Sequence, residues 1–198
     1  NGTSAIHAAF LALNLKNGDE VLLPGFGYLA AANIGRLMGL NIKFVDVDHD
    51  TFCLNFSDLK KKLSNKTRAV IFIHTYGNGG DILKISKFLR RKKVILIEDA
   101  AEALGSKIKS KYLGTIGDIG TFSFHATKNI TTGEGGCVVA KNKLLIERVK
   151  LFRSHGVKSK RYFHYVSGHN FRLTNLQAAI GFSQIKKFKK IMSKRKKI

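Results

Sequence analysis

The chain has 198 residues and a mass of 22.0 kDa, and 44% of its residues are hydrophobic, including 14 Phe and 5 Tyr. This composition suits one domain with a real core and argues against disorder, and no apolar run reaches the roughly 18 residues that a membrane helix needs. The net charge of +22 comes from Lys and Arg spread along the whole chain, which disfavours nucleic-acid binding as the main function.

The two ends of the chain and its two cysteines give further expectations. The chain starts at Asn1, not Met, and ends within a basic, helical-looking run, so we expect a piece of a longer protein. Cys53 and Cys137 lie far apart without CxxC spacing, which indicates neither a zinc site nor a disulfide framework. A reducing, cytoplasmic setting without nucleic-acid or membrane partners is the expectation.

Helical and strand patterns alternate along the chain. Helical spacing covers 4–15, 29–39, 57–63, 81–91 and 143–153, and a further helix starts near 174. Short apolar strands are expected at 20–24, 42–48, 69–74, 94–99, 119–124 and 136–140. The last two strands leave no room for a crossover helix. The pattern therefore predicts an α/β fold in three layers (α/β/α), with a mixed, mostly parallel sheet between helices.

In such sheets, sites form at the carboxyl ends of the strands. Three features there carry chemistry. Thr3 and Ser4 open a helix and offer either an anion site or an ordinary cap. Asp99 ends a buried strand, where it either caps the next helix or holds a ring nitrogen protonated. Lys128 follows another strand and is either a solvated lysine or an imine-forming amine.

Taken together, these features supply a phosphate cradle, a ring-nitrogen partner and a reactive amine, the set that pyridoxal 5'-phosphate needs. The histidines are less informative. His125 could equally contact a substrate or pack within the protein, and His74 is expected to line the cleft. No HExxH or other metal-ligand spacing occurs, and neither a Walker loop nor a GxGxxG follows a strand, so neither a metal site nor a dinucleotide cofactor is expected.

The spacing of these features resembles the DegT/DnrJ/EryC1/StrS family of pyridoxal-phosphate sugar aminotransferases. The strings that carry the resemblance are NGTSAIHAAFLAL, GDEVLLPGFGYLAAAN, FVDVD, IEDAAEALGS, GDIGTFSFHATKNITTGEGG, FRSHG and GHNFRLTNLQAAIG. The resemblance implies the large domain of a fold-type I enzyme. Residues 1–185 would form that domain without its N-terminal part, and 186–198 would begin the connection to a small C-terminal domain.

The same resemblance implies residue roles. Lys128 would bind the cofactor covalently and shuttle the proton, and Asp99 would pair with the pyridinium nitrogen. Glu102 would lie beside the 3-hydroxyl, where many relatives carry Gln, and Tyr28 would stack on the ring. The phosphate would be bound by Thr3, Ser4 and Ser123, and by Asn170 of the neighbouring subunit in a homodimer with shared sites.

The resemblance also suggests the reaction. Glutamate would be the amino donor, and the acceptor would be a keto group on a nucleotide-linked deoxy sugar. The EDAAEA string and 160–175 resemble the perosamine-synthase branch, whose members act on a GDP-linked 4-keto-6-deoxy sugar for surface polysaccharide. The alternatives are an aminotransferase for an inositol- or aminoglycoside-type ketone, a dehydratase of the family, or a non-catalytic binding or regulatory protein. Dehydratases of the family replace the lysine with His, so Lys128 argues against that branch.

Overall fold

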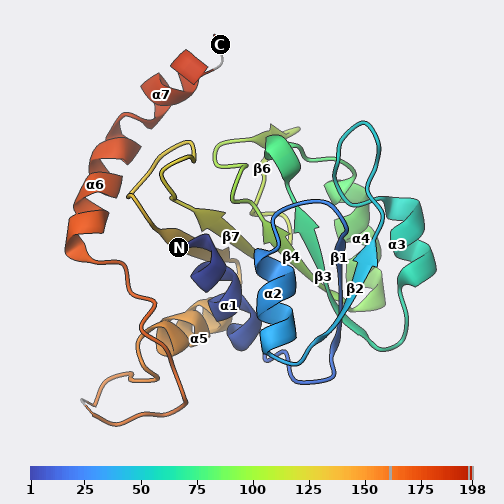
Figure 1. Cartoon of the computed structure of the whole chain (residues 1–198), viewed down its shortest axis with the longest axis horizontal. Helices are drawn as coiled ribbons and strands as arrows, with labels where there is room; N and C mark the ends of the chain where they lie inside the picture. Colours follow the sequence, from blue (N-terminus) through green and yellow to red (C-terminus); the bar gives the residue numbers. More distant parts are fainter. Residues whose placement is uncertain (161, 196, 198) are drawn as a thin grey trace.

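A computed structural model describes residues 1–160, 162–195 and 197 (Figure 1). At its centre lies a six-stranded sheet with the order β2-β1-β3-β4-β7-β8. The strands are β1 (Glu20–Pro24), β2 (Asn41–Val45), β3 (Thr67–Ile73), β4 (Ile95–Asp99), β7 (Ile119–Ser123) and β8 (Gly136–Ala140). Neighbouring strands are parallel, except that β8 runs antiparallel to β7. The expected mixed, mostly parallel sheet is confirmed.

Helices cover both faces of this sheet. One layer consists of α1 (Gly2–Ala12), α2 (Ala30–Leu37) and α5 (Lys143–Arg153), and the other of α3 (Phe56–Lys62) and α4 (Ile82–Lys92). The alternation along β3 shows why two layers are needed: Ile71 and Ile73 pack toward α1 and α2, while Val70 and Phe72 pack toward α3 and α4. Both faces of the central strand β3 are therefore covered, as the three-layer expectation requires.

The amino ends of the strands are joined by a buried carboxylate. Glu20, the first residue of β1, is 1% exposed and lies 2.6 Å from the Lys43 ammonium on β2. Its Oε1 accepts hydrogen bonds from the hydroxyls of Thr67, on β3, and of Ser64 at 2.6 and 2.8 Å. This cluster lies at the opposite end of the strands from the expected site.

Several element boundaries differ from the sequence expectation. Helix α1 begins at Gly2, because the side chain of Asn1 accepts the Ser4 N–H at 2.8 Å and so caps the helix two residues early. Strand β2 ends at Val45, because Val47 pairs with Leu54 in an isolated bridge and turns the chain away from the sheet.

Three short elements were not expected. They are the 3-10 turn η1 (Thr75–Gly77) and the two-residue strands β5 (Lys107–Ile108) and β6 (Lys111–Tyr112). The helix expected from about 174 is two helices, α6 (Asn175–Lys186) and α7 (Phe188–Arg195), which are interrupted at Lys187.

Helices α6 and α7 extend away from the sheet (Figure 1). Gly181 is the buried residue of α6 and faces Thr132, and Phe188 at the start of α7 packs over Gly105. Most of the apolar side chains of α6 are exposed. The expected division at residue 185 stays a prediction. Among the described residues, no helix is both long and apolar enough to cross a membrane.

Candidate active site

The sites expected at the strand ends converge on one cavity. It has a volume of about 740 Å³ and lies at the carboxyl ends of β1, β3, β4 and β7, beside the N-terminus of α1. Six of the eight predicted site residues line it, namely Thr3, Tyr28, Asp99, Glu102, Ser123 and Lys128. The topology explains this convergence, because parallel strands bring residues that are distant in sequence to one edge of the sheet.

Asp99 forms the floor of the cavity and is 5% exposed. Its Oδ1 accepts the Ala101 N–H at 3.1 Å, so Asp99 also organises the turn that follows β4. Burial raises the pKa of this carboxyl above its usual range, although the Ala101 hydrogen bond and the charges of His74 and Lys128 oppose that rise. A carboxylate in this position gains stability from any cation or N–H donor brought into the cavity.

Lys128 reaches the same cavity from the loop after β7. Its Nζ lies 3.5 Å from Oε1 of Glu102, and the Glu102 Oε2 accepts the backbone N–H of Tyr76 at 2.8 Å. Tyr76 has a left-handed backbone, with φ of 54°, which is uncommon for a residue other than glycine. The turn after β3 thus fixes Glu102, and Glu102 in turn positions the amine of Lys128.

The N-terminus of α1 lies against Ser123. A Cβ on Gly2 would come within 3.3 Å of the Ser123 hydroxyl, and a Cβ on Gly136 would collide with the Asn1 carbonyl. The first-turn N–H groups of a helix have no partner within the helix and carry partial positive charge. Together with the Ser123 hydroxyl, the N-terminus of α1 therefore forms a region of the cavity wall suited to a phosphate.

Ser4 and Asn170 are the two predicted site residues that do not line the cavity. The N–H of Ser4 is already bound by Asn1. Asn170 pairs with Ser154 in an isolated bridge, and its Oδ1 accepts a hydrogen bond from Arg172 Nε at 3.0 Å. The expectation that Asn170 serves the cavity of a neighbouring subunit stays a prediction.

Aromatic rings surround the entrance of the cavity. Tyr28 is 80% exposed and lines the cavity, as expected of a ring available for stacking. Phe26, Phe52 and Tyr76 form a further cluster, with ring centroids 5.5 to 6.5 Å apart. Phe26 and Tyr76 line the cavity, and Phe52 packs against both without lining it. Sequence reasoning gave Phe52 no role, and its position depends on a left-handed backbone with φ of 54°. No pattern in the sequence marks such a conformation at a residue other than glycine.

His125 and Glu134 lie at another part of the rim. The Nδ1 of His125 faces the Thr127 backbone N–H, at 3.3 Å, and the Thr127 hydroxyl, at 3.0 Å. Its Nε2 lies 3.7 Å from Glu134 Oε1. Of the two possibilities for His125, its place in the lining favours access to a bound substrate. Within the described residues, no group of three or more His, Cys, Asp or Glu could hold a metal ion.

The donor set of the cavity fits pyridoxal 5'-phosphate. A buried carboxylate suits a protonated ring nitrogen, an amine suits the aldehyde, and a helix N-terminus with a hydroxyl suits the phosphate. Fold and site together define the class of the protein. It is a three-layer α/β protein with a lysine and a buried carboxylate facing one cavity, whose wall is suited to a phosphate.

Comparison with known proteins gives the family. The family model of the DegT/DnrJ/EryC1/StrS aminotransferase family matches residues 1–198, and the chain belongs to this family. It is 44% identical over 199 residues to a GDP-perosamine synthase of Escherichia coli O157:H7 and 39% identical to one of Vibrio cholerae. Each alignment covers 100% of this chain but 55% and 54% of those relatives. The chain thus spans about half the length of the curated relatives it matches.

A solved structure agrees with this assignment. The GDP-4-keto-6-deoxy-D-mannose-3-dehydratase of E. coli, determined with bound hydrated PLP, superposes with a TM-score of 0.92 at 30% sequence identity. The superposition covers 99% of this chain and 57% of that chain. The α/β fold of pyridoxal-phosphate aminotransferases is confirmed by this likeness.

Proposed function

We propose that this chain is the cofactor-binding part of a pyridoxal-phosphate aminotransferase that acts on nucleotide-linked deoxy sugars. The observation that carries the proposal is the convergence of Lys128 and Asp99 on one cavity, from a loop and a strand 29 residues apart in sequence. The family of the chain supports the reaction type, because the model that matches the chain is that of an aminotransferase family.

Each predicted site residue that lines the cavity has a task in this reaction. Bound pyridoxal phosphate supplies an aldehyde that accepts the amino group and a ring that withdraws electrons. Asp99 would hold a proton on the ring nitrogen, and Lys128 would accept and return the proton that moves in the reaction. Glu102 orients the Lys128 amine. Tyr28 would stack on the ring, and Thr3, Ser123 and the N-terminus of α1 would bind the phosphate.

The substrates proposed are L-glutamate as donor and a GDP-linked 4-keto-6-deoxy sugar, such as GDP-4-keto-6-deoxymannose, as acceptor. The identity to two GDP-perosamine synthases supports a GDP-linked acceptor. A place in surface-polysaccharide biosynthesis is proposed from the resemblance of 160–175 to the perosamine-synthase branch. We also propose a homodimer with shared sites. Its support is the position of Asn170 outside the cavity of its own chain and the exposed apolar side chains of α6.

The first experiment tests the enzyme class. The natural full-length protein, purified with pyridoxal phosphate, is expected to be coloured, and borohydride is expected to fix the cofactor to Lys128. Lys128→Ala should keep the fold and lose both properties, while Lys111→Ala, on the exposed strand β6, should keep them. A colourless wild-type protein, or unchanged labelling in Lys128→Ala, would overturn the proposal in favour of a non-catalytic binding protein.

The second experiment tests the acceptor. The enzyme is incubated with glutamate and a panel of 4-keto and 3-keto sugar nucleotides and inositol-type ketones, and release of 2-oxoglutarate is measured. The expected result is turnover with the GDP-linked 4-keto sugar. Turnover of inositol-type ketones alone would contradict the sugar-nucleotide assignment. Loss of the 3-hydroxyl without formation of 2-oxoglutarate would indicate a dehydratase.

A further inference from the structure

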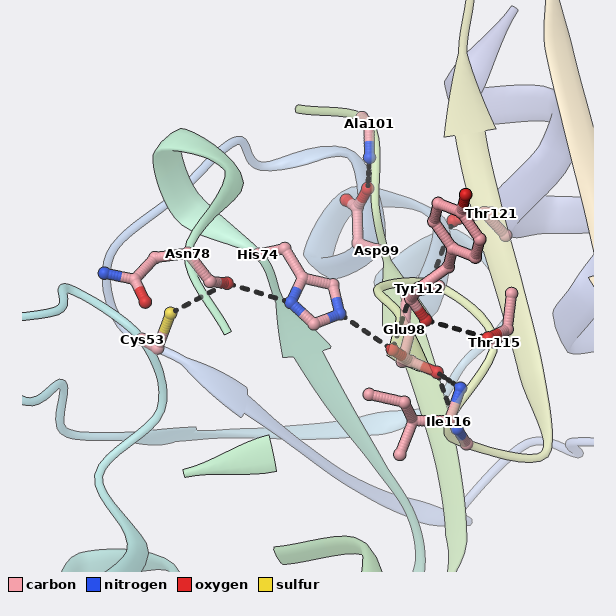
Figure 2. A network of polar contacts seen from close by, with 12 residues as sticks. Cys53, His74, Asn78, Glu98, Asp99, Ala101, Tyr112, Thr115, Ile116 and Thr121 are labelled. Carbon is pink, nitrogen blue, oxygen red and sulfur yellow. Dashed lines mark hydrogen bonds and ion pairs between the residues drawn. The ribbon is translucent and has the colours of Figure 1, made fainter. Parts of the chain in front are cut away.

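His74 and Glu98 form a fully buried pair beneath the candidate active site. Both side chains are 0% exposed, and His74 Nε2 lies 2.8 Å from Glu98 Oε2. The other ring nitrogen, Nδ1, lies 3.0 Å from the carbonyl oxygen of Asn78 (Figure 2). Neither residue has a role in the reaction described above. Removing an ionisable pair from water lowers the stability of the fold, so a pair buried at this position is expected to have a function.

The contacts of this pair fix its charge. A carbonyl oxygen accepts hydrogen bonds and cannot donate, so Nδ1 of His74 must carry a hydrogen. Nε2 faces Glu98, whose Oε1 accepts the backbone N–H groups of Ile116 and Gly117 at 2.6 and 2.5 Å. The Glu98 Oε2 accepts the N–H of Gly114 at 2.8 Å. Three N–H donors favour the ionised carboxylate, and an ionised Glu98 requires Nε2–H as well, so His74 is an imidazolium.

The pKa of Glu98 agrees with this arrangement. Burial by itself would raise the pKa, but the hydrogen bond from His74 and those from the backbone of Gly117 and Gly114 outweigh burial and hold the pKa below its usual value. The pair is therefore a fixed positive charge directly after β3 and a fixed negative charge on β4. The negative member is enclosed by its own hydrogen-bond donors, whereas the positive member faces the cavity end of the strands.

His74 is coupled to Asp99 by position and by charge. Its backbone N–H donates to the carbonyl of Asp99 at 2.9 Å, and both residues line the same cavity. Burial raises the pKa of Asp99, and the positive charge of His74 opposes that rise. The other ionisable groups around this point are Lys128, Glu102 and, on the far side of Asn78, the thiol of Cys53, which donates to the Asn78 carbonyl at 3.6 Å.

We propose that His74 is a positioning residue for Asp99: held as an imidazolium by Glu98, it fixes the end of β4 and keeps the Asp99 carboxylate ionised, ready for a protonated ring nitrogen. This inference rests on the proposed function, because it assigns to Asp99 the role of cofactor partner. It adds a series of fixed charges in the order Glu98, His74, Asp99, which act on one another electrostatically and exchange no proton.

The charge state can be tested without cofactor. In the cofactor-free protein with ¹⁵N-labelled histidine, His74 is assigned by comparison with His74→Gln, and its ring-nitrogen shifts are measured at pH 7. Both nitrogens are expected to carry a hydrogen, as their contacts with Asn78 and Glu98 require, and Glu98→Gln is expected to remove one of the two. A neutral imidazole in the wild-type protein would overturn the proposal, whatever the variants do.

The coupling to Asp99 is tested by cofactor binding against pH. In His74→Gln, the pH below which the affinity for pyridoxal phosphate falls is expected to move up by about one unit, as expected for the loss of one nearby charge. Glu98→Gln should move it in the same direction. The control is Phe72→Leu, which alters packing 4.9 Å from the His74 ring without changing charge. It should lower thermal stability without moving this pH limit.

The outcomes separate the two proposals. If the wild-type protein binds no pyridoxal phosphate, the proposed function fails and this inference fails with it. If the wild-type protein binds the cofactor and His74→Gln binds it with an unchanged pH limit, the inference alone fails. An equal shift in Phe72→Leu would assign the effect to packing and would also count against the charge of His74.

Discussion

At the scale of single residues, Asp99 is the side chain in which stability and function oppose each other. Its carboxyl is almost fully buried, and burial raises its pKa above the usual value of 3.8. Ionising a group whose pKa is raised by folding costs stability, and the full cost applies above the folded-state pKa. Near neutral pH, the cofactor-free protein therefore carries this cost in its cavity.

Asp99→Asn is expected to stabilise the cofactor-free protein at pH 8 by about 1–3 kcal/mol, because Asn never ionises. The Asn oxygen still accepts the Ala101 N–H, so the turn is kept. The gain should shrink toward zero at pH 4, where the wild-type carboxyl becomes protonated, and affinity for pyridoxal phosphate should fall. Denaturant unfolding at the two pH values measures the difference. A variant less stable than wild type at pH 8 would contradict the prediction.

At the scale of elements, the buried Glu20 joins β1, β2 and β3 at the end opposite the cavity. Burial would raise its pKa, but hydrogen bonds from Lys43, Thr67 and Ser64 outweigh burial and lower it. A carboxyl with a lowered pKa contributes stability above its unfolded pKa of 4.5 and loses that contribution as the pH falls through the folded-state value.

Glu20→Gln is therefore expected to cost about 1–3 kcal/mol at pH 7, because it weakens the charge-assisted hydrogen bonds of a buried carboxylate whose ion-pair partner, Lys43, is half-exposed. The difference from wild type should narrow as the pH falls below 4.5, where the unfolded chain becomes protonated, and should vanish below the folded-state pKa, where the folded wild-type carboxyl is protonated as well. Cofactor affinity should not change, because the cluster lies at the far end of the strands. Urea unfolding measures the change in stability, and a titration with pyridoxal phosphate on the same samples measures the change in affinity. A loss of affinity without a loss of stability would contradict the purely structural role given to Glu20.

Another element-scale prediction concerns the contact between β8 and α1. A Cβ at Gly136 would collide with the carbonyl of Asn1, so Gly136→Ala should push the N-terminus of α1 away from Ser123. We expect affinity for pyridoxal phosphate to fall by about 10- to 100-fold, since charge-assisted phosphate contacts are worth about 1.5–3 kcal/mol each.

Gly18→Ala is the matched control for this variant. Gly18 has a φ of 87° and no atom within 4 Å of an added Cβ, so alanine there strains the backbone without moving α1. It should lower stability and leave the affinity unchanged. Equal affinities in the two variants, measured by equilibrium titration, would contradict the role given to the N-terminus of α1.

The limits of sequence reasoning also show at the scale of elements. The strand-end rule located Lys128 and Asp99, because parallel strands of buried apolar residues are easily recognised and their ends share one edge, whereas the role of Glu102 was named only through the family resemblance. The left-handed turn at Tyr76 that fixes Glu102 could not be predicted, since nothing in the sequence marks a positive φ at tyrosine. Strands β5 and β6 have two residues each, too few for any periodicity to appear.

At the scale of the whole molecule, α6 is an element whose apolar side chains the rest of the described chain leaves largely uncovered. Leu176, Phe182 and Ile185 are 81%, 63% and 60% exposed, although each is strongly apolar. Clusters of this kind mark surfaces that are covered by another partner. In the proposed homodimer, a second copy would cover them.

The double variant Phe182→Asp with Ile185→Asp is expected to shift the full-length protein from dimer toward monomer and to lower its activity. Its control is Leu144→Asp on α5, where an equally apolar side chain is 72% exposed outside α6. Sedimentation velocity over a range of concentrations measures the change. Identical sedimentation of wild type and both variants would exclude α6 from the dimer interface.

The antiparallel pairing of β8 with β7 has a consequence for biogenesis. The lysine-bearing loop is closed by that hairpin, and the cavity joins residues as far apart in sequence as Thr3 and Lys128. On the ribosome, contacts of such separation form late, after the intervening strands have emerged and paired. Nascent chains shorter than the β7–β8 hairpin would have no complete site, so the supply of vitamin B6 would act on the finished fold and not on its early intermediates.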